Sequence, residues 1–215
     1  MGLALFDLDN TLLDRVGAFA RWADAFIRQH GLPATAWPFM ESADQDGMTP
    51  KEIFFAHVRE QFDMSCSLEE LLASYYVDYP SCYVADPQTV SGLRELRNRG
   101  WRVAVVSNGG PAQLAKLEAT DLAGECDAIC ISEIIGASKP DPAIFEMAAD
   151  LCEMPLKGWM TGDSVEADMA GGRGVGLRTI WIERGRQWTS PDPAPDAVVM
   201  TVVQAIKIIL ETDRN

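Results

Sequence analysis

The segment LALFDLDNTLLD, residues 3–14, carries the pattern that decides the fold. Its first four residues, LALF, are all apolar, and two aspartates, Asp7 and Asp9, then interrupt the apolar run. A short run that is apolar throughout is typical of a strand buried on both faces of a parallel sheet. Side chains alternate along a strand, so Asp7 and Asp9 are expected to project on the same side while Leu8 points into the core.

Residues 15–85 contain helical patterns and no convincing strand. Apolar residues recur at helical spacing between Val16 and His30, a second helical run follows Thr49-Pro50, and a third begins at Ser67 with an acidic first turn. The segment also holds 12 of the 18 aromatic residues of the chain. We therefore predict a small, all-helical unit with an aromatic core, inserted after the first strand.

Strands and helices alternate in the rest of the chain. Apolar runs predict strands at residues 101–106, 128–131, 158–161, 179–182 and 197–200, and helices are predicted at 87–100, from 111, at 141–152, near 165–172 and up to about 211. Such alternation is typical of a parallel sheet with helices on both faces. The expected fold is α/β, a Rossmann-like doubly wound sheet formed by residues 1–14 and 86–215, with residues 15–85 inserted into it.

Charge and composition argue against several classes of function. The 215 residues include 32 acidic and 18 basic side chains, a formal net charge of −14, which argues against binding to nucleic acid or to an anionic membrane surface. No apolar run approaches the roughly 18 residues that a membrane span needs. Five cysteines, an odd number without metal-type spacing, argue against a disulfide scaffold and favour a reducing compartment. We expect a cytoplasmic protein, either a monomer or a weak homodimer.

Polar residues stand where several predicted strands end. In open parallel sheets, ligands bind beyond the carboxyl ends of the strands. The residues placed there are Asp7, Asp9 and Thr11 after the first strand, Ser107, Asn108 and Gly109 after the second, Asp163 after the strand near 158–161, Asp168 in the following helix, and Lys139 in the loop before another helix. Clustered carboxylates repel one another, so a cation is expected to hold them together, and Mg²⁺ suits oxygen ligands.

These residues, in this order, resemble the motifs of the haloacid dehalogenase superfamily. The matching segments are DLDNT at 7–11, VVSNGG at 105–110, SKPDPAIF at 138–145 and GDSVEAD at 162–168. The resemblance spans the whole Rossmann-like part, and the inserted helices resemble the α-helical C1 cap of the family. It implies a Mg²⁺-dependent phosphatase that hydrolyses a small soluble phosphomonoester through an aspartyl-phosphate.

The resemblance also implies a role in catalysis for each of the first two motifs. Asp7 would attack phosphorus, while Asp9 would protonate the leaving oxygen and then deprotonate the attacking water. Ser107 and the free N–H groups of residues 108 and 109 would hold the phosphoryl oxygens. Thr11 would orient the turn and the nucleophile.

The last two motifs are expected to help bind the metal ion and to balance the charge of the phosphoryl group. By resemblance, Asp7, Asp163 and the backbone carbonyl of Asp9 hold the Mg²⁺ ion. Lys139 balances the charge of the phosphoryl group together with that ion. Asp168 orients either Lys139 or a metal-bound water from behind.

Each motif also has a simpler structural interpretation. Asp9-Asn10 and residues 107–109 could be ordinary turns, Lys139 a solvated loop residue, and Asp168 a helix-capping acid. Glycines at 171–176 follow a helix and precede a strand, which is the reverse of a dinucleotide-binding loop, so they indicate a helix stop and a turn.

Two other functions stay open on the same scaffold. One is a phosphotransferase or phosphomutase, although Gly17-Ala18-Phe19-Ala20 lacks the basic or imidazole group that hexose-phosphate mutases of the family carry there. The other is a binding protein that keeps the fold without turnover. In the inserted unit, Arg15 and Arg21 are the best basic candidates for reaching a substrate, with a role on the helix face as the alternative.

Overall fold

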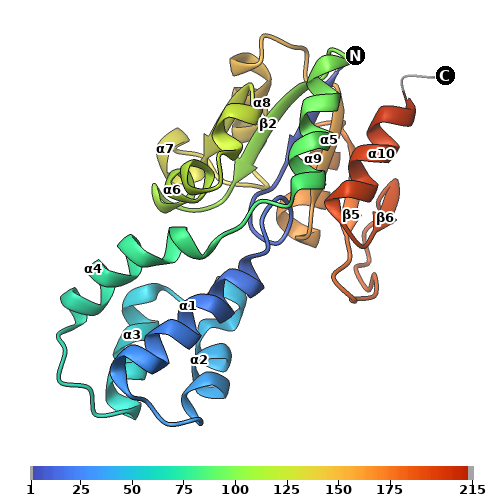
Figure 1. Cartoon of the computed structure of the whole chain (residues 1–215). Coiled ribbons are helices and arrows are strands. Elements are labelled where there is room, and N and C mark those ends of the chain that lie inside the picture. Colours follow the sequence, from blue (N-terminus) through green and yellow to red (C-terminus); the bar gives the residue numbers. More distant parts are fainter. Residues whose placement is uncertain (1, 213–215) are drawn as a thin grey trace. The chain divides into compact units, whose positions relative to one another are not determined.

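The computed structural model describes residues 2–212, which divide into two compact units. One unit combines the described residues up to Asp14 with those from Ala85 onward, and the other spans Arg15–Val84. Figure 1 shows the chain, with its α-helices and three of its strands labelled. Within residues 2–212, no helix combines the length and the apolar character that crossing a membrane requires.

The first unit is built on a six-stranded sheet. Its strands are β1 (Leu3–Phe6), β2 (Arg102–Ser107), β3 (Ala128–Ile131), β4 (Gly158–Gly162), β5 (Arg178–Ile182) and β6 (Ala197–Val199). All neighbouring pairs are parallel, in the order β3-β2-β1-β4-β5-β6. The predicted α/β class with a doubly wound parallel sheet is confirmed, and each strand from β2 to β6 lies within one residue of the run predicted for it.

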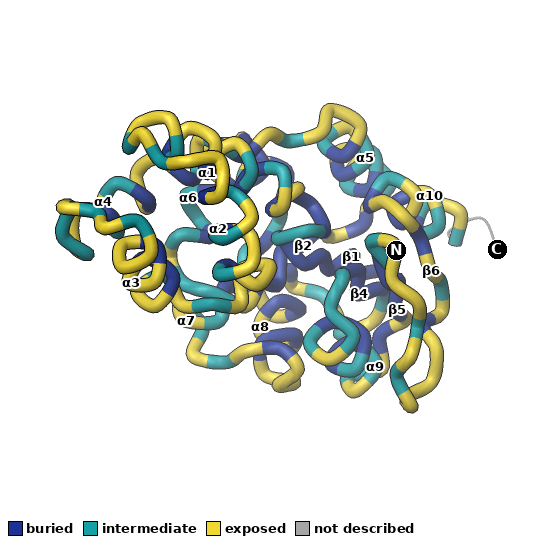
Figure 2. The backbone as a smooth tube through the Cα atoms, turned by 90° about the horizontal axis from the view of Figure 1, so that it is seen from below, coloured by how far each residue is buried: buried dark blue, intermediate teal, exposed yellow. Residues whose placement is uncertain are grey.

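Helices cover both faces of this sheet. Figure 2 shows α5 (Pro87–Asn98) and α10 (Val202–Thr212) on one side of the row of strands, and α8 (Pro142–Leu151) and α9 (Gly171–Gly174) on the other. Leu3 and Leu5 of β1 are fully buried in a cluster with Ile144 and Phe145 of α8. A strand covered on both faces has no solvent side, which explains why its sequence does not alternate.

The strand order reverses on either side of β1. The chain runs from β1 through β2 to β3 at one edge and then returns to β4, on the other side of β1. Ligands in such sheets bind at this switch point, beyond the carboxyl ends of the strands. Three short elements also follow strands here, namely α6 (Ala112–Ala119) after β2, α7 (Ser132–Ile135) after β3 and the π-helix η4 (Val165–Ala170) after β4.

The second unit contains four α-helices among its described residues. They are α1 (Arg15–His30), α2 (Ala36–Asp44), α3 (Lys51–Gln61) and α4 (Leu68–Asp78), with 3-10 turns η1 (Gln45–Gly47) and η2 (Tyr79–Cys82). The Trp22 ring lies 5.1 Å from that of Phe26 and 4.9 Å from that of Tyr75, so aromatic packing forms the core as predicted. Ser67 begins α4 with a reciprocal capping box to Glu70.

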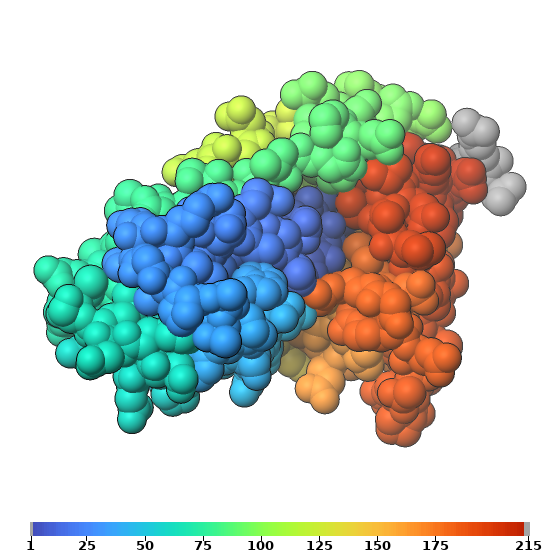
Figure 3. All heavy atoms as spheres, turned by 60° about the horizontal axis from the view of Figure 1, so that its bottom comes forward, coloured from blue at the N-terminus to red at the C-terminus, as the bar shows by residue number. Residues whose placement is uncertain are grey.

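Two further elements complete the first unit. The 3-10 turn η3 (Leu122–Glu125) leads into β3, and a long loop joins β5 to β6. Figure 3 shows that loop, in orange, at the surface. All five cysteines are free thiols, and Cys130 is buried in β3 as a small apolar side chain.

Candidate active site

The backbone of Asp7 is held between neighbouring strands. β1 ends at Phe6, whose partner in β4 is Thr161, and the N–H of Asp7 donates to the Thr161 carbonyl over 2.9 Å. Asp7 is only 8% exposed. A carboxylate on a rigid strand end, at the point where the strand order reverses, occupies a well-defined position.

Lys139 bridges two carboxylates at this position. Its Nζ lies 2.7 Å from Asp7 Oδ1 and 2.7 Å from Asp168 Oδ1. Lys139 is 4% exposed and Asp168 is fully buried. The second oxygen of Asp168 accepts a hydrogen bond of 2.9 Å from the N–H of Ser164, the residue that caps η4. Asp168 therefore fixes the position of the Lys139 amine, which is one of the two roles expected for Asp168.

Asn108 fixes the loop that carries Lys139. Its side-chain NH₂ group donates to the Lys139 carbonyl over 2.9 Å, and its Oδ1 accepts from the Lys139 N–H over 2.8 Å. The neighbouring N–H of Gly109 donates to Ser132 Oγ over 2.9 Å. The expectation that Gly109 offers a free N–H to a phosphoryl oxygen is thus wrong, because α7 places Ser132 against it.

Burial sets the electrostatics of the cluster. It raises the pKa of Asp7 from 3.8 to about 6, although Lys139 acts in the opposite direction. Burial also raises the pKa of Asp163 and of Asp168. For Lys139, burial alone would lower the pKa, but Asp168 and Asp7 outweigh it and raise the pKa, so this amine stays charged. The carboxylates of Asp7, Asp163 and Asp168 together carry more negative charge than Lys139 alone balances.

The donor set fits a hard cation. Carboxylate oxygens of Asp7, Asp163 and Asp168 all lie within 4.8 Å of one another. Oxygen donors of this kind suit Mg²⁺, which binds through one or two carboxylates and keeps part of its water. Among the described residues, two buried hydroxyls in the segments that carry Asp7 and Asp163, those of Thr11 and Thr161, find no hydrogen-bond partner.

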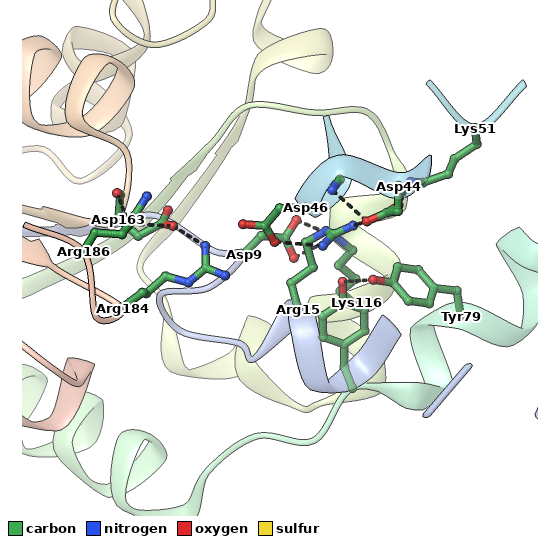
Figure 4. Close-up of polar contacts among 12 residues, drawn as sticks. Asp9, Arg15, Asp44, Asp46, Lys51, Tyr79, Lys116, Asp163, Arg184 and Arg186 are labelled. Carbon is green, nitrogen blue, oxygen red and sulfur yellow. Dashed lines mark hydrogen bonds and ion pairs between the residues drawn. The ribbon is translucent and has the colours of Figure 1, made fainter. Parts of the chain in front are cut away.

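Asp163 has two arginine partners that the motif analysis missed. Arg184 Nη1 is 2.9 Å from Asp163 Oδ2, and Arg186 Nη2 is 3.3 Å from the same oxygen. Figure 4 shows both guanidinium groups directed at Asp163. They come from the loop after β5, the strand next to β4, whose end carries Asp163.

Asp9 also has partners that the sequence did not reveal. Lys116 Nζ lies 2.9 and 2.6 Å from the two oxygens of Asp9, as Figure 4 shows. Gln113 Nε2 donates to Asp9 Oδ2 over 3.1 Å and to Ser107 Oγ over 2.8 Å. The structure therefore links Asp9 with Ser107 through α6.

The two arginines proposed for substrate binding are engaged inside the helical unit. Arg15 forms ion pairs with Asp44 and, over 3.1 Å, with Asp46. Arg21 donates from Nε to the Cys82 carbonyl over 2.7 Å. Both contacts match the alternative in which these arginines stabilise helix packing.

Comparisons with known proteins agree with this arrangement of site residues. The family model of haloacid dehalogenase-like hydrolases matches residues 1–176. A phosphoserine phosphatase of Thermus thermophilus is 30% identical, with 86% of this chain and 76% of that protein aligned. An N-acylneuraminate-9-phosphatase of Mus musculus is 34% identical, with 97% and 93% aligned.

One solved structure is similar to this fold over nearly the whole chain. A haloacid dehalogenase-type phosphatase from Thermococcus onnurineus superimposes with a TM-score of 0.68 and 26% identity, covering 97% of both chains. The relatives support an enzyme that acts on phosphomonoesters. By its family match, its relatives and its fold, the chain belongs to the haloacid dehalogenase-like hydrolases.

Proposed function

We propose that this protein is a Mg²⁺-dependent phosphatase that hydrolyses a small phosphomonoester through an aspartyl-phosphate on Asp7. One observation carries the proposal. Asp7 is a buried carboxylate that lies 2.7 Å from a buried lysine and within 4.8 Å of the oxygens of two further aspartates. Charged groups gathered beside the end of β1 suit phosphoryl transfer, a reaction that depends mainly on positioning and electrostatic stabilisation.

In the first half of the reaction, Asp7 is the nucleophile. Its oxygen forms a bond to phosphorus while the bond from phosphorus to the leaving oxygen breaks. Asp9 gives a proton to the leaving oxygen. Ser107 Oγ and Lys139 Nζ hold the phosphoryl oxygens, and Asp168 keeps Lys139 in place through its 2.7 Å contact.

In the second half, water replaces the leaving group. Asp9 accepts a proton from the water as its oxygen attacks phosphorus, and the bond between phosphorus and the Asp7 oxygen breaks. Inorganic phosphate leaves and the Asp7 carboxylate is restored. The same residue thus acts first as an acid and then as a base.

Asp7, Asp163 and the Asp9 carbonyl are the proposed ligands of Mg²⁺, with Asp168 kept for Lys139. When bound, the ion would offset the repulsion of the carboxylates and draw charge from a phosphoryl oxygen. Burial raises the pKa of Asp7 and of Asp163 even though Lys139 and two arginines act in the opposite direction, and a cation bound between the two carboxylates would favour their ionised forms.

The helical unit is proposed to act as a cap. It joins the core through two chain connections, at Asp14–Arg15 and Val84–Ala85. Insertions of this type can select the leaving group and exclude water during the reaction. Its buried charges, such as those of Arg15 and Asp44, are paired within the unit itself.

A phosphate-release screen tests the proposed function. The purified protein is assayed with Mg²⁺ against a broad panel of phosphorylated metabolites and 4-nitrophenyl phosphate, and substrates are ranked by kcat/KM. Phosphate release that needs Mg²⁺ and disappears in Asp7→Asn is the expected result. Release from no compound in the panel, or undiminished release by Asp7→Asn, would contradict the proposal.

A further inference from the structure

Lys116 is a buried lysine that the usual motifs of the site do not include. It is 7% exposed, and its Nζ lies 2.6 Å from Asp9 Oδ2 and 2.9 Å from Asp9 Oδ1. Lysine is rarely buried unless it is paired, because removing its charge from water is costly. A buried ion pair often adds little to stability compared with apolar packing, so its presence calls for another reason.

Gln113 connects the same aspartate to a second residue of the site. Its single NH₂ group donates to both Asp9 Oδ2 and Ser107 Oγ. Gln113 and Lys116 are three residues apart on α6, so they occupy one face of the helix, and both are buried. One helix face therefore holds Asp9 and Ser107, which come from the ends of two adjacent strands.

We propose that Lys116 and Gln113 are positioning residues that fix the orientation of the Asp9 carboxyl group toward the leaving group. This inference rests on the proposed function, in which Asp9 transfers the proton. Three contacts on one carboxyl group restrict its rotation, and Gln113 relates that orientation to Ser107, which holds the phosphoryl group. A proton donor displaced by about 1 Å can lose about a hundredfold in rate.

The inference makes a specific kinetic prediction, because leaving groups differ in their need for a proton. The 4-nitrophenolate ion leaves readily without one, whereas the alkoxide released from benzyl phosphate does not. Misplacing Asp9 should therefore impair benzyl phosphate hydrolysis much more than 4-nitrophenyl phosphate hydrolysis. The ratio of the two kcat/KM values within one protein preparation is independent of how much of the variant has folded.

The experiment compares this ratio in the wild type, Lys116→Met, Asp9→Asn and the double variant, all with Mg²⁺. Lys116→Met is expected to lower the benzyl-to-nitrophenyl ratio by about 10- to 100-fold, part of the roughly 10²- to 10⁴-fold that a general acid supplies. In the Asp9→Asn background, Lys116→Met should change the ratio no further, since its effect acts through Asp9. The exposed Lys157, in the turn before β4, gives the matched control Lys157→Met, which should leave the ratio unchanged.

The outcomes separate this inference from the proposed function. A ratio in Lys116→Met within about threefold of wild type, while Asp9→Asn lowers it, overturns the positioning role alone. An additional loss in the double variant also overturns it, because the lysine would then act independently of Asp9. If Asp9→Asn leaves the ratio unchanged, or the wild type hydrolyses neither ester, the proposed function fails and the positioning role fails with it.

Discussion

Replacing Asp7 by asparagine is expected to abolish phosphate release and yet stabilise the metal-free protein. In the wild type, Asp7 and Asp168 share the positive charge of Lys139, at 2.7 Å each. Asparagine has nearly the same size and leaves Lys139 with one partner, Asp168. The substitution removes a buried negative charge that the protein does not fully compensate.

The pKa of Asp7 gives the magnitude and the sign. Burial raises this pKa from 3.8 to about 6, so the folded state disfavours the carboxylate. The cost of ionising Asp7 is absent below about pH 4, where the group is protonated in both states, and is fully present above about pH 6. At about 1.4 kcal/mol per pKa unit, a shift of about two units corresponds to about 3 kcal/mol. Asp7→Asn should gain up to that amount at pH 7.5.

Urea denaturation measures this gain directly. The free energy of unfolding is determined for wild type and Asp7→Asn in EDTA at pH 7.5 and at pH 4.5, and again at pH 7.5 with Mg²⁺. The advantage of the variant should shrink at pH 4.5, and Mg²⁺ should stabilise the wild type more than the variant. A variant that is at least 1 kcal/mol less stable than wild type in EDTA at pH 7.5 would refute the reasoning.

Three further outcomes follow from the same contacts. Lys139→Met should lose activity and about 3–5 kcal/mol of unfolding free energy in EDTA, because it removes the positive charge that pairs with the buried carboxylates of Asp7 and Asp168; a loss under 1 kcal/mol in urea denaturation would contradict this. Arg184→Gln should bind Mg²⁺ about two- to fivefold more tightly in calorimetry, since a cation that competes for Asp163 is removed; weaker binding would show that the arginine instead orients the ligand. Ser67→Ala should cost about 0.5–2 kcal/mol by removing the cap of α4, and an unchanged urea midpoint would argue against that cap.

The parts of the fold that the sequence predicted are those with a strong local pattern. The strands are mostly apolar and do not alternate because helices cover both faces of the sheet. The glycines from Gly171 to Gly174, predicted to be a helix stop and a turn, instead form the short helix α9. The helices α2 and α7 were not predicted. The first contains Pro38 and has no side-chain cap, and the second is only four residues long, too short to show a helical period.

In the candidate site, too, the sequence placed residues whose position follows from a local pattern, and it missed contacts between distant segments. Residues at strand ends, such as Asp7 and Asp163, could be placed because parallel strands bring their carboxyl ends to one edge. The partners of Asp9 could not, since Lys116 lies on a helix whose rotation is set by packing. The error at Gly109 has a similar origin, because its partner Ser132 begins a helix that the sequence did not predict.

The central claim is that Asp7 becomes phosphorylated, and trapping that species tests it most directly. The Asp9→Asn variant, which should hydrolyse the intermediate slowly, is mixed with 4-nitrophenyl phosphate and Mg²⁺, quenched in acid within milliseconds to seconds, and digested for peptide mass spectrometry. We predict one added phosphoryl group on the peptide that contains Asp7, formed in a burst equal to the enzyme concentration and absent in Asp7→Asn. A stoichiometric burst with the phosphoryl group on another residue, or steady turnover with no phosphorylated enzyme at any time, would contradict the claim.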